Sequence, residues 1–175
     1  MHGTIYQVQK DPDVKDNLID ESSFYDPEEK RSSFIGNACD YLNDITDRHD
    51  GDELDFIESE ALGAVVEVSN ENRSFKIGDK KPYMDREYIA CAEQLEALNK
   101  IFTRDNFERE EWIALPLELF RLKKKISGST NDLYFIITDP DIPGHFPDPM
   151  KLTDFLRYAK TGETWYVGSI FDMHY

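Results

Sequence analysis

The sequence has no hydrophobic run that could cross a bilayer, and only two of its 175 residues are cysteine. A membrane-spanning helix needs about 20 apolar residues, and the N-terminal segment MHGTIYQVQK lacks the apolar stretch of a signal peptide. Cys39 and Cys91 are too few for a disulfide framework, so we interpret both as reduced, inert core thiols on the apolar faces of helices. These absences predict a cytoplasmic protein with no membrane partner.

Motifs of nucleotide binding and nucleophilic catalysis are also missing. The sequence contains no GxGxxG, no Walker loop and no GxSxG elbow. Of the four histidines, two lie near the termini and one lies in an acidic loop, which leaves His145 as the candidate partner for a cysteine. The sequence therefore indicates no catalytic residue, no metal ligand set and no cofactor, and it leaves open whether the protein is an enzyme.

Positive charge is scarce, because 20 lysines and arginines face 36 acidic residues and the net charge is −16. Residues 1–60 are the most acidic part, with 17 acidic and 5 basic side chains. Such a field repels nucleic-acid phosphate and anionic lipid and attracts a basic partner. The basic run RLKKK at 121–125 suits the negative end of a helix dipole. We expect no nucleic-acid partner, and the acidic surplus serves either solubility or the docking of a basic protein.

The first half of the chain predicts both strand and helix. Residues 3–9 partly alternate apolar and polar side chains, as a first strand does. A helix is expected from Asp26, which can cap it, with Leu42 and Ile45 on its buried face. Residues 63–78 contain two β-rich arms around a polar turn, which predicts a hairpin.

The second half continues the alternation. A helix with an apolar stripe is expected over 85–102, and a capping box at Asp105 opens another. The run LYFIIT at 133–138 is typical of a strand covered on both faces. Asp148 is expected to cap a short helix that precedes a last strand at 164–171.

Together these elements predict a single α+β domain over residues 1–175, in the usual size range of domains. Its strongly acidic part is 1–60, and 139–175 adds a C-terminal helix and strand. We expect a mixed, mostly antiparallel sheet of about four to six strands, with helices packed mainly on one face.

The stretch GDKKPYMDREYIACAEQL at 78–95 resembles the centre of the small bacterial YfbM-like family of uncharacterised proteins. The strand MHGTIYQV, the helix around 38–45 and the passage into LYFIIT come in a similar order. The resemblance covers roughly residues 1–138, and this chain departs from the family in a shorter middle and in the added region 139–175. It implies an α+β fold and no established activity, so no functional residue carries over.

The acidic loop DRHDGDELD at 47–55 is the first candidate site. An EF-hand is excluded, because placing Gly51 sixth would put Thr46, Arg48 and Ile57 at ligand positions that need carboxylate or amide oxygens. We expect a non-enzymatic protein whose patch steers a basic partner in a salt-dependent manner, as an immunity protein or inhibitor docks a cationic toxin. A DNA mimic would need the acids spaced like phosphates. The patch consists of Asp47, Asp50, Asp52, Glu53 and Asp55.

The loop TDPDIPGHFPDP, which follows LYFIIT, is the alternative site. Asp139, Asp141 and His145 can bind a divalent metal or polarise a substrate, and the end of a strand is a common place for ligands. The same residues also suit a rigid connection, because Asp before Pro favours a turn. The alternative function is therefore a small-ligand- or metal-binding enzyme with its site at 139–145.

The C-terminal segment GETWYVGSIFDMHY is rich in aromatic residues. Alternation along a strand sends Trp165 and Val167 to one face and Tyr166 to the other. Two interpretations stay open, a strand in the core or an aromatic edge that binds a partner.

Overall fold

A computed structural model describes residues 2–24, 41–47, 53–108, 117–122, 132–138 and 149–174. Its strands are β1 (His2–Gln9), β2 (Tyr41–Asp44), β3 (Val65–Ser69), β4 (Ser74–Ile77), β5 (Leu133–Ile137), β6 (Met150–Lys151) and β7 (Thr164–His174). Its helices are the 3-10 helices η1 (Pro12–Asp16) and η2 (Glu21–Phe24) and the α-helices α1 (Glu53–Ala61), α2 (Lys81–Ile101), α3 (Arg104–Glu108) and α5 (Leu152–Tyr158). Residues 117–122 are also helical.

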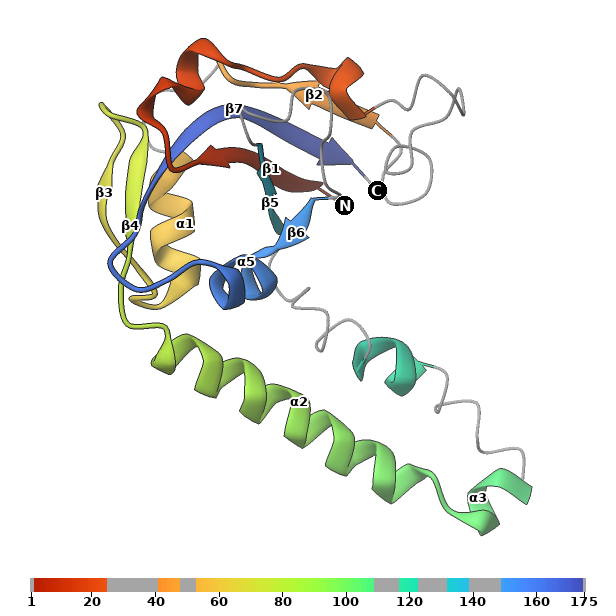
Figure 1. Ribbon diagram of the computed structural model, residues 1–175. Helices are drawn as coiled ribbons and strands as arrows, with labels where there is room; N and C mark the ends of the chain where they lie inside the picture. The colour runs from red at the N-terminus through yellow and green to blue at the C-terminus, as the bar shows by residue number, and fades with distance from the viewer. Residues whose placement is uncertain are drawn as a thin grey trace.

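The described strands form one seven-stranded sheet in the order β3-β4-β7-β1-β5-β6, and β2 also pairs with β7 (Figure 1). Strands β1 and β5 run parallel, whereas the other described pairs are antiparallel. The α+β prediction is confirmed, and so is the mixed, mostly antiparallel sheet. The number of strands exceeds the expectation because the short strands β2 and β6 were not foreseen.

Strand β7 organises the sheet because it is long enough to serve three neighbours. Its residues 166–174 lie beside β1, its first residues pair with β4 and its last residues pair with β2. Figure 1 shows the sheet curving around α1 and α5, which lie on its inner side. The expectation that helices lie mainly on one face is therefore correct.

Aromatic stacking holds the main core between the sheet and α5. The rings of Phe135 and Phe155 stack with centroids 4.4 Å apart, and Phe155 meets Trp165 edge-on at 5.1 Å. Each of these side chains is at most 1% exposed. Trp165 therefore belongs to a strand in the core. This agrees with the first interpretation of the C-terminal segment, a core strand rather than an aromatic edge. The opposite face carries a smaller core under η1 and η2, where Phe24 packs on Phe171.

A bulge interrupts the pairing of β1 with β7, since the register shifts on either side of Gln7. The Gln7 side chain replaces the lost ladder bond, because its Oε1 accepts a hydrogen bond from the Ser169 backbone N–H at 2.9 Å. The Arg73 guanidinium donates to the Gly168 carbonyl in the same place. Side chains thus satisfy the backbone groups that the bulge leaves unpaired, and bulges often lie beside functional sites.

Helix α2 confirms the expected helix but differs in its start and in its burial. It begins at Lys81 because Pro82 suits a first helical turn. Figure 1 shows it leading away from the sheet, and beyond its first turns the apolar stripe is mostly exposed. Leu98 is buried, whereas Leu95 is exposed and Cys91 is half-buried, so Cys91 is not the core thiol that we expected.

The sequence was wrong about the segment that holds Leu42 and Ile45. Residues 41–44 form strand β2, not the end of a helix, and Leu42 is buried in the smaller core. The helix expected from Asp26 otherwise falls on 25–40, outside the described residues, as does Cys39. Strand β4 pairs only with the start of β7, so the same edge of β7 is free near its end. Residues 41–44 pair with that free edge, and this pairing outweighs their local helical pattern.

Two expected caps were also wrong, and one helix was missed. Thr103, rather than Asp105, caps α3, because its Oγ1 accepts from the Asn106 N–H at 3.1 Å. Lys151 precedes α5 in extended conformation, so Asp148 does not cap that helix. The missed helix is α1, which occupies part of the acidic segment that we expected to be a loop.

Candidate functional site

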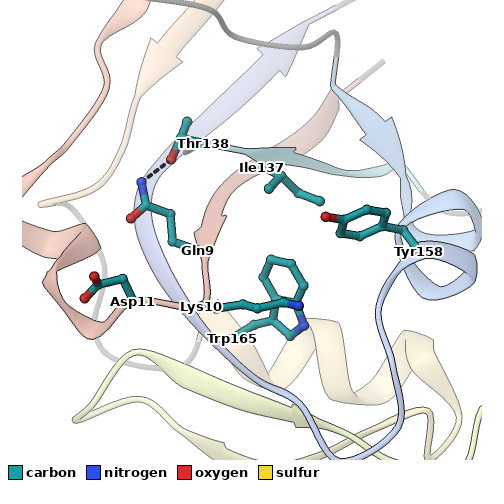
Figure 2. A pocket seen from close by; sticks show the side chains of 7 residues that line it. All are labelled: Gln9, Lys10, Asp11, Ile137, Thr138, Tyr158 and Trp165. Atoms are coloured by element: carbon teal, nitrogen blue, oxygen red, sulfur yellow. Dashed lines mark hydrogen bonds between the residues drawn. The ribbon is translucent and has the colours of Figure 1, made fainter. Parts of the chain in front are cut away.

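A pocket of about 270 Å³ lies at the C-terminal ends of the parallel strands β1 and β5, beside α5 and the start of β7. The carboxyl ends of parallel strands are a common place for ligands, because side chains from several segments converge there. Figure 2 shows the lining residues, which are Gln9, Lys10, Asp11, Ile137, Thr138, Tyr158 and Trp165.

Two aromatic residues line the pocket, one fixed and one exposed. Trp165 is 1% exposed and is held in the core by Phe155. Tyr158, at the end of α5, is 59% exposed, and its ring centroid lies 6.2 Å from that of Trp165. In Figure 2 the Tyr158 hydroxyl points into the space between Ile137 and Trp165. The aromatic surface open to a ligand is therefore that of Tyr158, with the fixed indole beside it.

Thr138 joins two buried glutamines at the polar side of the pocket. Its Oγ1 lies 3.0 Å from Gln7 Nε2 and 2.6 Å from Gln9 Nε2. A hydroxyl both donates and accepts, so either orientation of the Gln9 amide satisfies Thr138. The Gln9 Oε1 at the other end of that amide has no partner in the described chain. Gln9 is only 4% exposed, so this polar group is withheld from water as well.

A second polar atom is unpaired on the same lining. Trp165 Nε1 is buried and has no hydrogen-bond partner in the described chain. Leaving a buried donor or acceptor unpaired costs about 1–3 kcal/mol, and native proteins seldom retain such groups without a reason. Two of them on residues that line one pocket indicate a place where a bound molecule would lower the free energy.

The charged residues of the pocket are already engaged with each other. Lys10 Nζ donates to Glu163 Oε1 at 2.7 Å and lies 5.2 Å from the centroid of the Trp165 ring. Glu163 Oε2 accepts from the Lys160 backbone N–H at 2.8 Å. The hydrogen bond from Lys10, followed by that from Lys160, lowers the pKa of Glu163. Asp11 Oδ1 accepts from the Asp13 N–H at 2.9 Å and caps η1.

A second groove of about 270 Å³ lies between α2 and the helical segment 117–122. Its lining is almost wholly apolar, and no buried unpaired polar atom of the described chain belongs to it. It offers nothing that would recognise a particular ligand, and it serves below as a control. Its lining residues are Leu95, Leu98, Asn99, Phe102, Leu119 and Leu122.

The alternative site of the sequence analysis lies next to the first pocket. Asp139, Asp141 and His145 fall outside the described residues. Thr138, which directly precedes Asp139, lines the pocket. The strand end that the sequence singled out is therefore the strand end where the pocket lies.

The acidic patch is described only in part. Burial lowers the pKa of the Arg73 guanidinium, and the charges of Asp47 and Asp44 oppose this shift without cancelling it. Asp55 Oδ1 accepts a hydrogen bond from Asn70 Nδ2 at 3.0 Å. Asp50, Asp52 and the side chain of Glu53 lie outside the description. Docking of a basic partner by this patch stays a prediction.

Sequence reasoning missed Gln9, Lys10 and Tyr158 as site residues. A signal was present in strand β1, TIYQVQ, where Gln7 and Gln9 repeat with the period of a strand between apolar neighbours. Two polar side chains on one face of a buried strand need partners, which indicates an internal polar cluster. Nothing in the sequence indicated that Tyr158 and Trp165 would lie beside it.

Across the ranges that the structure describes, no three histidine, cysteine, aspartate or glutamate side chains come together as a metal site. No described helix combines the length and apolar character needed to cross a bilayer. Comparison with protein-family models, curated proteins and solved structures found no match. The resemblance to the YfbM-like family therefore stays a prediction.

Proposed function

We propose that this protein binds a small organic ligand in the pocket at the C-terminal ends of β1 and β5. One observation carries the proposal: the buried Gln9 amide and the buried Trp165 indole each keep an unpaired polar atom, and both residues line that pocket. A ligand that bonds to these atoms would offset their desolvation cost. The cytoplasmic location expected from the sequence is part of the same proposal.

The proposal is one of binding and assigns no bond-making step. Lys10 and Asp11, the charged residues of the described lining, are held by Glu163 and by the start of η1. A general acid or base needs a group that is free to exchange a proton with the substrate. The pocket hypothesis depends on side chains that the structure describes, whereas the acidic patch is described only in part.

The indole N–H of Trp165 offers a direct test of binding. The chain has two tryptophans, so a ¹⁵N-labelled sample gives two indole resonances, and Trp112→Phe assigns that of Trp165. We expect benzamide, benzoate or benzamidine, titrated to about 10 mM to detect millimolar affinity, to shift this resonance saturably. Absence of a shift with all three probes would overturn the proposal.

Two variants show where the probe binds. Ile137→Phe adds volume to a half-buried lining residue and should abolish the saturable shift. Leu119→Ala alters the apolar groove beside α2 and should leave the shift unchanged. Backbone spectra establish that both variants remain folded. A shift that survives Ile137→Phe and disappears in Leu119→Ala would place the binding elsewhere and contradict the proposal.

A further inference from the structure

The charges around the pocket leave little room for an anionic ligand. Lys10 is the lining cation, and its ammonium already bonds to Glu163. That carboxylate is fixed on its other oxygen by the Lys160 N–H, so it would stay beside any anion that bound Lys10. Two neighbouring like charges repel, and the net charge of −16 adds to the repulsion.

A cationic ligand is disfavoured for a different reason. Asp11 is the lining anion, and it caps η1 through its bond to the Asp13 N–H. Figure 2 shows the Asp11 carboxylate turned away from Trp165 and Tyr158. The ammonium of Lys10 lies over the Trp165 ring, where a cationic ligand would stack. The place that a cation would occupy is thus taken by the chain itself.

The uncharged groups of the pocket define what a ligand must offer. The Trp165 indole is a donor only, so it requires an acceptor such as a carbonyl oxygen. The free end of the Gln9 amide and the Tyr158 hydroxyl lie on opposite sides of the pocket, and each can pair with a neutral polar group of a ligand. The Tyr158 ring is exposed and tilted by 60° to that of Trp165, so a planar ring can pack on the open face of Tyr158.

Access to the indole N–H requires one side chain to move. The Trp165 nitrogen is shut off from water, and Lys10 lies over the indole ring. Lys10 is half-exposed and has a flexible stem, so the stem can shift off the ring when a ligand enters. The ammonium stays bonded to Glu163 and continues to repel a cation.

We infer that the ligand is a neutral, planar molecule with an amide edge, the chemistry shared by aromatic carboxamides and nucleobases. The inference rests on the proposed function and narrows it to one chemical class. It follows from three features of the same pocket: engaged charges, unpaired neutral polar groups and aromatic faces.

The three probes named above differ in charge and have nearly the same shape, so they separate this inference from the proposed function. We expect benzamide to bind at least about tenfold more tightly than benzoate or benzamidine, as measured by the Trp165 indole shift. Tighter binding of benzoate or of benzamidine would overturn the inference, and so would three equal affinities. In each of these cases a small-ligand site would remain, whereas no shift with any probe would remove the site itself.

A pair of variants tests the role of the fixed carboxylate. Glu163→Gln removes the charge that repels an anion and frees Lys10, so benzoate affinity should rise at least about threefold. Glu96→Gln is the matched control, because Glu96 pairs with Lys100 on α2, away from the pocket lining. It should change none of the three affinities. Benzoate affinity that does not respond to Glu163→Gln would overturn the role assigned to this carboxylate.

Discussion

Lys10 and Glu163 are 153 residues apart in the chain and meet in an ion pair 2.7 Å long. The contact joins the end of β1 to the turn before β7 and keeps the Lys10 ammonium over Trp165. Because the carboxylate also accepts from the Lys160 N–H, the pair links two turns at one side of the pocket. Its protonation should therefore be visible at Trp165.

Acid should release this pair at a pH below the usual titration range of glutamate. The bonds from Lys10 and Lys160 lower the pKa of folded Glu163, so the stabilisation is complete at neutral pH. It is lost as the pH falls through the lowered pKa. A carboxyl ¹³C titration should give this midpoint, and the Trp165 indole shift should follow it. Lys10→Met should raise the midpoint, and an unchanged midpoint in that variant would contradict the assigned cause.

Gly168→Ala should destabilise the fold by about 3 kcal/mol, because the cost of overpacking adds to the cost of broken buried hydrogen bonds. A Cβ at this position would lie 2.7 Å from Gln7 Cδ and 2.9 Å from Val14 Cγ2. Gln7 cannot yield cheaply, because buried hydrogen bonds hold both ends of its amide. Denaturant unfolding of the variant measures the loss.

Gly162→Ala is the control for that prediction. Gly162 has φ +89° and open space around a Cβ, so its substitution carries backbone strain without a clash. We expect a cost of about 1–2 kcal/mol. A larger loss in Gly162→Ala than in Gly168→Ala would show that space beside Gln7 does not limit the bulge.

Gln7→Met should cost at least about 3 kcal/mol, because it orphans several buried backbone groups at once. The Gln7 amide accepts from the N–H groups of Ile19 and Ser169 and donates to the Asn17 carbonyl. Amide hydrogen exchange at Ser169 should accelerate together with the loss of stability. Gln94→Met, a half-buried position on α2, should cost about 1 kcal/mol or less. Equal losses in the two variants would refute the role given to Gln7.

Phe155→Ala should cost about 3–5 kcal/mol, as expected for removal of a buried aromatic side chain. Phe155 stacks on Phe135 at 4.4 Å and supports Trp165 at the pocket. Phe102→Ala removes the same side chain where it is 64% exposed, and should cost less than about 0.5 kcal/mol. Thermal or denaturant unfolding distinguishes the two. A small effect of Phe155→Ala would mean that the core does not depend on this stack.

The elements that sequence reasoning identified correctly are those with a strong local pattern. β1, the β3–β4 hairpin, β5 and β7 each combine strand-forming residues with clear turn signals at their ends. β2 shows the opposite case, because its four residues form a strand only where β7 supplies a free edge. α1 could have been found, since Leu54, Ile57 and Ala61 have helical spacing and are all buried.

The candidate site was predictable in position and not in composition. Local chemistry marked the end of LYFIIT as a place for ligands, and Thr138 lines the pocket there. Local chemistry could not show that Gln9 and Trp165 would each be buried with an unpaired atom. Whether a polar atom is paired depends on every neighbour in space.

By itself the sequence determined the class of the fold, because apolar periodicity requires particular strands and helices to bury one face. It also determined the acidic character of the chain. Tertiary structure decided that β1 and β5 lie parallel and that β7 returns beside β1, which brings residues 9–11, 137–138 and 158–165 together. The physical reason is that strand pairing joins distant segments through backbone hydrogen bonds whose partners no local pattern specifies.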